Sequence, residues 1–211
     1  NLRVIVFFSD GLPEAIGALL PFKTTADCIV PGVFNYSNDG MYSLYESEPV
    51  PLGGKCQLIR YANNGSEIQT VARLPDWYNA HNVLDDPAKR EFPLVTGGYR
   101  PVTSDIYLER SNSMRVNIEH AARNLPEAIA AKARDEGIFV FTLGMGNLKT
   151  KTGDPSETGE SILKCMANVA DGPARCYNPA KPVGTYCYAA TEADLTPCFS
   201  RLASAILRIS K

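Results

Sequence analysis

The chain has 211 residues, of which 45% are hydrophobic and 21% are charged, with a formal net charge of -2. This composition is that of an ordinary globular protein with one sizeable domain or two small ones. The small negative charge argues against a protein that binds nucleic-acid phosphates. No apolar run reaches the roughly 18 residues of a membrane-spanning helix.

A near-continuous apolar run, Leu2–Phe8, opens the chain and is typical of a strand buried on both faces of a parallel sheet. The run ends at Asp10, and the carboxyl ends of strands are where open α/β sheets bind their ligands. The chain begins at Asn1 without an initiator Met or a signal-like segment. We therefore expect a processed or partial chain, in which strands from upstream sequence or from a companion chain flank Leu2–Phe8.

Residues 12–112 differ in composition from the rest of the chain, because they are rich in Gly, Pro, Asn, Ser and Tyr. The turn signals Asn38-Asp39-Gly40 and Asn63-Asn64-Gly65 each lie between strand-like segments and predict two hairpins. The paired segments are Cys28–Tyr36 with Met41–Glu46, and Cys56–Ala62 with Ser66–Arg73. Residues 74–110 carry few periodic signals, which predicts loop with short strands. We expect a β-rich insertion over 12–112.

Aromatic residues gather in this insertion, and Tyr and Trp favour protein interfaces. The candidates for a partner-binding surface are Tyr36, Tyr42, Tyr45, Trp77 and Tyr78. The alternative is a small satellite core beneath a long insertion, and the sequence leaves both interpretations open.

A regular alternation of helices and strands begins at Ser113. Apolar residues at helical spacing predict a helix from Ser113 to a stop at Gly137. Pro126 interrupts this helix, and Asn124 with Glu127 resembles a capping box, so we expect a kink or a restart there.

Three further elements follow before the last helix: a buried strand over Ile138–Leu143, a helix over 159–170 and a short strand over Thr185–Ala189. The last helix is expected to have Thr196 as its N-cap and Pro197 as its first residue. Its apolar stripe is expected to begin at Phe199 and to continue through Leu202, Ile206 and Ile209. This order predicts a parallel α/β sheet with right-handed crossovers.

The cysteines are even in number, which favours disulfides formed in an oxidising compartment. They are Cys28, Cys56, Cys165, Cys176, Cys187 and Cys198. No pair has the C-x-x-C spacing typical of a zinc site. We expect at least two disulfides, with Cys28 bonded to Cys56 and the last four cysteines paired among themselves. We attach no meaning to the equal spacing of those four.

Three segments, Val4–Gly11, Ala133–Gly146 and Ser161–Ser210, resemble in their order and spacing the second half of a von Willebrand factor type A domain. The resemblance is greatest to bacterial TadG-like proteins associated with Flp/Tad pili, and it covers about half the chain, residues 2–11 and 113–210. It implies a Rossmann-like three-layer α/β fold, with the N-terminal half of the domain missing. The domains are then residues 1–11 with 113–211, and the insertion 12–112.

The resemblance also implies a metal-ion-dependent adhesion site. Asp10 matches one Asp ligand of that site, and the family's Asp-x-Ser-x-Ser loop and Thr are expected upstream of Asn1. Oxygen ligands of this kind suit Mg²⁺ or Ca²⁺ and leave a position for a partner's carboxylate. On residue type alone, Asp10 before Gly11 is explained by a turn. The segment Asp154–Thr158 has Asp, Ser and Thr at a spacing similar to that of the family's metal-binding loop. It does not follow an apolar strand, so it is the weaker candidate for a metal site.

No catalytic residues are expected. The two histidines, His81 and His120, accompany no Gly-x-Ser-x-Gly elbow, and His120 is expected on the polar side of its helix. Gly144-Met145-Gly146 lacks the third glycine of a dinucleotide-binding loop.

We therefore expect a non-enzymatic adhesion or assembly module of a bacterial cell surface or pilus, in an extracellular or periplasmic location. Its partner would be a protein, either a pilus subunit or a host surface protein, and its metal site would be completed by upstream residues. The alternative is a purely structural subunit with a degenerate metal site, and a secreted hydrolase is a second alternative. Metal dependence of partner binding separates the first two, and turnover of ester or peptide substrates would identify the third.

Overall fold

The computed structural model describes residues 2–21, 29–35, 40–43, 74, 76–78, 90–103 and 112–209. The chain forms two compact units, residues 1–12 with 126–211 and residues 13–125. Helix α1, Asn112–Asp135, contributes residues to both units.

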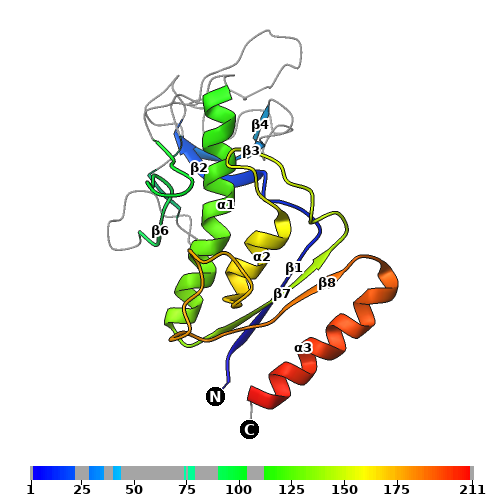
Figure 1. The fold of residues 1–211 in the computed structure, drawn as a ribbon. Coiled ribbons are helices and arrows are strands. Elements are labelled where there is room, and N and C mark those ends of the chain that lie inside the picture. The colour runs from blue at the N-terminus through cyan, green and yellow to red at the C-terminus, as the bar shows by residue number, and fades with distance from the viewer. Residues whose placement is uncertain are drawn as a thin grey trace. The chain divides into compact units, whose positions relative to one another are not determined.

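A three-stranded parallel sheet forms the centre of the first unit (Figure 1). The central strand β7, Phe139–Met145, lies between β1, Val4–Ser9, and β8, Tyr186–Ala189. Because both neighbours run parallel to β7, the carboxyl ends of all three strands lie at one edge of the sheet. The predicted α/β class and the predicted parallel sheet are confirmed.

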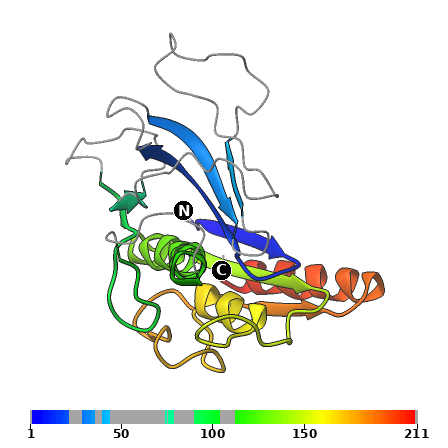
Figure 2. The same ribbon diagram turned by 90° about the horizontal axis from the view of Figure 1, so that it is seen from above.

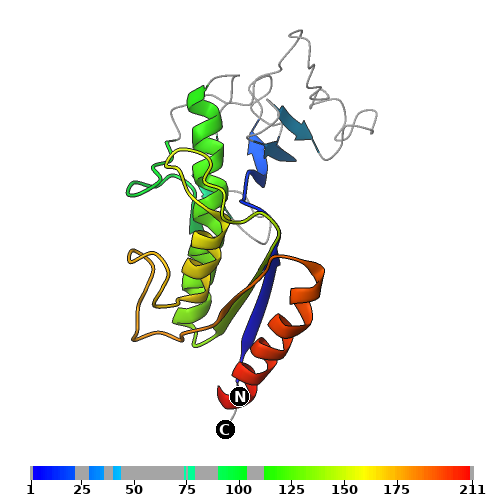
Figure 3. The ribbon, with the colours of Figure 1, turned by 45° about the vertical axis from the view of Figure 1, so that its right-hand side comes forward.

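Helices cover both faces of this sheet (Figures 2 and 3). One face packs against α2, Gly159–Ala167, and against the last turns of α1, and the other packs against α3, Leu195–Ile209. Alternate β7 side chains serve the two cores: Val140 belongs to the α2 side, and Phe141 and Leu143 belong to the α3 side. The first unit is therefore a helix–sheet–helix arrangement of three layers.

β1 is far more exposed than β7. Four consecutive β1 side chains are between 39% and 49% exposed, namely Ile5, Val6, Phe7 and Phe8. Within this chain the strand is therefore not buried on both faces, and the expected flanking strands from upstream sequence or a companion chain stay a prediction. β1 pairs only with β7 among the described strands, so its side chains have packing neighbours on one side only.

Both ends of α2 are fixed by side chains. At its start, the Oγ1 of Thr158 accepts a hydrogen bond from the backbone N–H of Ser161 at 3.0 Å. At its end, Asn168 adopts the left-handed conformation with φ of 56°, which ends the helix short of the predicted residue 170. The buried Asn168 amide donates to the carbonyl of Asn178 at 2.8 Å and accepts from its N–H at 2.7 Å. Asn168 therefore holds the following loop against the end of the helix.

Replacing Asn168 with Ala is expected to lower the free energy of unfolding by about 2–4 kcal/mol, because it leaves buried backbone groups unpaired and places a β-carbon in a left-handed position. Asn168→Gly keeps the backbone conformation and loses only the hydrogen bonds, so its loss is expected to be smaller. The exposed Asn147→Ala serves as the control and is expected to change stability by less than about 0.5 kcal/mol. Urea denaturation measures all three, and equal midpoints for Asn168→Ala and Asn147→Ala would contradict the assignment.

α3 begins earlier than the sequence predicted. A single 3-10 turn, Glu192–Asp194, precedes it, and the backbone N–H and Oγ1 of Thr191 both donate to Asp194 Oδ2 at 2.9 Å. These bonds hold the pKa of the Asp194 carboxyl below its usual value. The prediction of Thr196 as N-cap is wrong, because the capping interaction lies one turn earlier, at Thr191.

The buried face of α3 differs from the prediction at its first residue. Its buried residues are Cys198, Leu202 and Ala205. Phe199 is 54% exposed and therefore does not begin the buried stripe. The rest of the predicted stripe is confirmed: Leu202 is buried, and Ile206 and Ile209 pack against the same core. Cys198 takes the first position of the stripe through its disulfide to β8.

α1 is one helix, with Pro126 inside it, so the predicted restart is wrong. Asn124 caps nothing; its Oδ1 accepts from Arg100 at 3.1 Å, and its Nδ2 donates to the Arg100 carbonyl at 2.8 Å. His120 is buried, with Nδ1 2.7 Å from the carbonyl oxygen of Pro101, so its predicted place on a polar face is also wrong. Arg100 and Pro101 therefore cover the face of α1 that carries Asn124 and His120, although the sequence pattern predicts that face to be polar and exposed.

The second unit contains two small antiparallel sheets. The larger has the order β2-β3-β4, with β2 at Ala15–Pro21, β3 at Ile29–Asn35 and β4 at Gly40–Ser43. Pairing of Asn35 with Gly40 confirms the first predicted hairpin. The smaller sheet joins β5, Trp77–Tyr78, to β6, Phe92–Pro93, which confirms short strands in 74–110. The second predicted hairpin lies outside the described residues.

Two disulfides lie in the first unit, Cys165–Cys176 and Cys187–Cys198, so the last four cysteines pair among themselves as predicted. The expected bond between Cys28 and Cys56 lies outside the described residues. No helix in the described part of the chain is long and apolar enough to cross a membrane.

Candidate functional site

The carboxyl edge of the parallel sheet is the candidate site. β1 ends at Ser9, opposite Gly144 of β7, and Met145 of β7 lies opposite Ala189 at the end of β8. The three strands therefore deliver three loops to one edge. Ligands of open α/β sheets bind at such an edge, because the loops there are free to differ while the strands hold them in place.

Asp10 is exposed directly after β1, at this edge. Ser9 fixes the turn beneath it: the Ser9 Oγ donates to the Gly11 carbonyl at 3.0 Å and accepts from the Gly11 N–H at 3.3 Å. On the β7 side, a β-carbon at Gly146 would lie 3.9 Å from the Asp10 carbonyl oxygen. The Ser9–Gly11 bonds thus hold the turn that contains Asp10, while the Asp10 side chain faces solvent.

The loop after β8 carries a second carboxylate, which is already engaged. Asp194 accepts its two hydrogen bonds from Thr191, as described above. The loop after β7 contributes a cation, since the Lys149 Nζ lies 4.7 Å from the centre of the Tyr188 ring. Tyr188 in turn donates its hydroxyl to the Gly146 carbonyl at 2.6 Å. Of these groups, the Asp10 carboxylate is the one that no described side chain or backbone group binds.

The described residues do not form a complete metal site around Asp10. Mg²⁺ and Ca²⁺ require six or more oxygen ligands, of which Asp10 supplies one carboxylate. Within the described ranges, the ligand-type side chains that gather closely are Glu127, Cys165 and Cys176. The two sulfur atoms of that group are bonded to each other, so they offer no thiolate to a metal. Any metal at Asp10 needs ligands from elsewhere.

Two residues of the weaker candidate, Asp154–Thr158, have structural roles. Thr158 is the N-cap of α2, and Glu157 is buried and bonded to Arg175 at 3.2 Å. A bridge between Thr152 and Glu157 closes the segment into a short turn. Its oxygen atoms at Thr158 and Glu157 are therefore committed to the fold.

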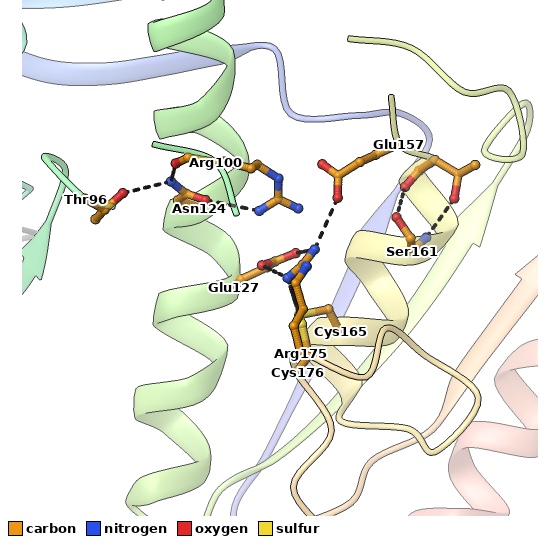
Figure 4. Close-up of polar contacts among 10 residues, drawn as sticks. Thr96, Arg100, Asn124, Glu127, Glu157, Ser161, Cys165, Arg175 and Cys176 are labelled. Atoms are coloured by element: carbon orange, nitrogen blue, oxygen red, sulfur yellow. Dashed lines mark hydrogen bonds and ion pairs between the residues drawn. A yellow bond between two sulfur atoms is a disulfide. The ribbon is translucent and has the colours of Figure 1, made fainter. Parts of the chain in front are cut away.

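Arg175 is the centre of a polar network that the sequence analysis missed (Figure 4). Its two terminal nitrogens bind the two carboxylate oxygens of Glu127 on α1, at 2.5 and 2.9 Å. The same guanidinium binds Glu157 and lies 2.9 Å from the Sγ of Cys176. The network ties the loop after α2 to α1 and to the segment after β7. No sequence signal indicates it, because the two carboxylates that bind Arg175 lie 18 and 48 residues away in the sequence.

The predicted aromatic surface is described only in part. Trp77 is 39% exposed on β5, with the Arg90 guanidinium 5.8 Å from its ring centre, and Tyr78 beside it is half-buried. Tyr42 lies in β4. Tyr36 and Tyr45 lie outside the described residues. The structure thus places Trp77 with Tyr78 and leaves the wider surface as a prediction.

Comparison with known proteins gives no match: no family model, no curated protein and no solved structure is significantly similar to the chain. The resemblance to von Willebrand factor type A domains therefore remains a prediction.

Proposed function

We propose that this chain is a non-enzymatic adhesion or assembly module, of a bacterial surface or pilus, which binds a protein partner at the carboxyl edge of its parallel sheet. The observation that carries the proposal is the Asp10 carboxylate, exposed at the end of β1 on a turn that Ser9 holds. A divalent ion bound there, completed by ligands from outside the described residues, would accept a carboxylate from the partner.

Three observations support the fold, the location and the assembly that this proposal assumes. The parallel three-layer unit matches the architecture in which strand-end loops bind ligands. The two disulfides are consistent with a non-cytoplasmic protein. The exposed apolar side chains of β1, Ile5 to Phe8, offer a surface that a further strand and its helices would cover, which fits assembly with a companion chain or segment.

A purely structural subunit is the second candidate. It is favoured because Asp10 alone cannot form a metal site, and because Asp194 and Glu157 are hydrogen-bonded within the fold. In that case the module would assemble through its apolar and aromatic surfaces, without any need for a metal.

Asp10→Ala in the full-length protein is expected to weaken partner binding at least about tenfold, and chelation with EDTA is expected to weaken it equally, because each removes the ion that joins the two carboxylates. The fold is expected to be unchanged, since Asp10 is exposed at a strand end. Glu192→Gln is the matched control, an exposed acid after β8.

Binding is measured by surface plasmon resonance in Mg²⁺, in Ca²⁺ and in EDTA, and folding by circular dichroism. Equal partner affinity for wild type and Asp10→Ala, with no effect of EDTA, would overturn the adhesion-site proposal in favour of the structural subunit.

A further inference from the structure

The outer edge of β8 borders a cavity of about 430 Å³ in the first unit. Five consecutive residues, 184–188, line it along the strand. Its walls come from three other elements: Lys164 of α2, Asp171 of the loop after α2, and Arg201 of α3. The cavity therefore runs beside the strand edge that faces away from β7.

The backbone groups of β8 alternate between β7 and this cavity. The carbonyl oxygen of Thr185 accepts a hydrogen bond from Thr142 of β7 at 2.9 Å, and that of Ala189 accepts one from Gly146, directly after β7, at 3.3 Å. Successive residues of a strand direct their backbone groups to opposite sides. The N–H and C=O groups of Tyr186 and Tyr188 consequently point away from β7. No described strand pairs with them.

The α2 side of the cavity is aromatic and carries one lysine between two carboxylates. The side chains of Tyr186 and Tyr188 pack on the α2 core. The Lys164 Nζ lies 5.6 Å from the centre of the Tyr186 ring and binds the Asp171 carboxylate at 2.8 Å. This hydrogen bond holds the pKa of the Asp171 carboxyl below its usual value. Lys164 also binds Glu160, which lines the cavity as well, so this side carries two carboxylates for one cation.

The α3 side carries the second cation of the lining, Arg201. Arg201 is exposed, and it forms no ion pair with any residue in the described part of the chain. It contributes to the lowered pKa of Asp171 only at longer range. A carboxylate is the group that would complement this guanidinium.

We propose that the outer edge of β8 binds an extended peptide segment of a protein partner, which adds to the sheet as a further strand and directs an acidic side chain toward Arg201. Strand addition obtains its affinity from main-chain hydrogen bonds, which Tyr186 and Tyr188 offer here, and its specificity from alternate side chains. On one face those side chains meet the tyrosine rings, and on the other they meet Arg201. The site goes beyond the proposed function, because it uses neither Asp10 nor a metal ion.

The test uses a displayed library of random nine-residue peptides, selected on the wild-type protein and then on Arg201→Glu. Peptides enriched on the wild type are expected to carry Asp or Glu at a fixed position. Arg201→Glu is expected to weaken their binding about tenfold, since an attraction becomes a repulsion. Arg208→Glu, at an exposed position nearer the end of α3, is the control and is expected to bind them like the wild type.

The main-chain part of the proposal has its own readout. Amide hydrogen exchange by NMR is expected to slow at Tyr186 and Tyr188 on peptide binding, while Cys187 and Ala189 are already protected by β7. N-methylation of the peptide at one set of alternate residues is expected to abolish binding, and at the other set to leave it unchanged.

Enrichment without acidic residues, equal enrichment on Arg201→Glu, or unchanged exchange at Tyr186 and Tyr188 would each overturn the proposal. Binding that persists in EDTA and in Asp10→Ala separates this site from the proposed metal-dependent one.

Discussion

Gly184→Ala is expected to destabilise the first unit by about 4 kcal/mol or more, or to prevent its folding. A β-carbon at Gly184 would lie 1.8 Å from the carbonyl oxygen of Val140 and 3.0 Å from that of Ala167. Both atoms are backbone, so no side-chain rotation relieves the overlap. The Gly184 N–H also donates to the Ala167 carbonyl at 2.8 Å, which fixes the approach.

Gly11→Ala is the matched control in the same unit, because a β-carbon there meets no atom within 4 Å. It is expected to change the free energy of unfolding by less than about 0.5 kcal/mol. Thermal and urea denaturation measure both variants. A Gly184→Ala protein that unfolds at the wild-type midpoint would falsify the close approach of Gly184 to β7.

Removal of the Cys187–Cys198 disulfide, by the double variant Cys187→Ala/Cys198→Ala, is expected to cost about 3 kcal/mol from lost ring closure alone. Both sulfurs are buried in the core between β8 and α3, so the shorter side chains add a packing loss. The same disulfide sets which face of α3 is buried. Loss of helix signal at 222 nm is therefore expected at a lower guanidinium concentration than in the wild type.

The control for this measurement is the wild-type protein with its thiols counted under denaturing conditions, with and without reductant. Four more thiols after reduction are expected from the two described disulfides. Four or more free thiols before reduction would contradict both the disulfides and the non-cytoplasmic assignment.

Elements with local signals could be predicted from the sequence. The apolar runs of β1 and β7 and the stripe of α2 identify strands and a helix, because each pattern lies within one short segment. The hairpin of β3 and β4 has an Asn-Asp-Gly signal at its turn. β2, Ala15–Pro21, was not predicted, because it contains Gly17 and Pro21, which are typical of the loops around it.

Features that depend on contacts across the chain could not be predicted. An apolar strand has the same pattern whether it lies inside a sheet or at its edge, so the exposure of Phe7 and Phe8 gave no signal. The apolar stripe of α3 could begin at Cys198 or at Phe199, and only the contact with β8 decides between them. Asp10 was placed correctly at a strand end, while Arg175 was missed because its partners are distant in sequence.

The two disulfides join cysteines that are neighbours in sequence, each pair 11 residues apart. The other two ways of pairing these four cysteines would each close at least one ring twice or three times as long. Short rings form with the smallest entropic cost, so the native pairs are also those that random oxidation favours. As the chain emerges in order during synthesis or export, Cys176 meets Cys165 before Cys187 or Cys198 has appeared. Among these four cysteines, oxidation in the order of synthesis is therefore expected to form the two native pairs with little disulfide isomerisation.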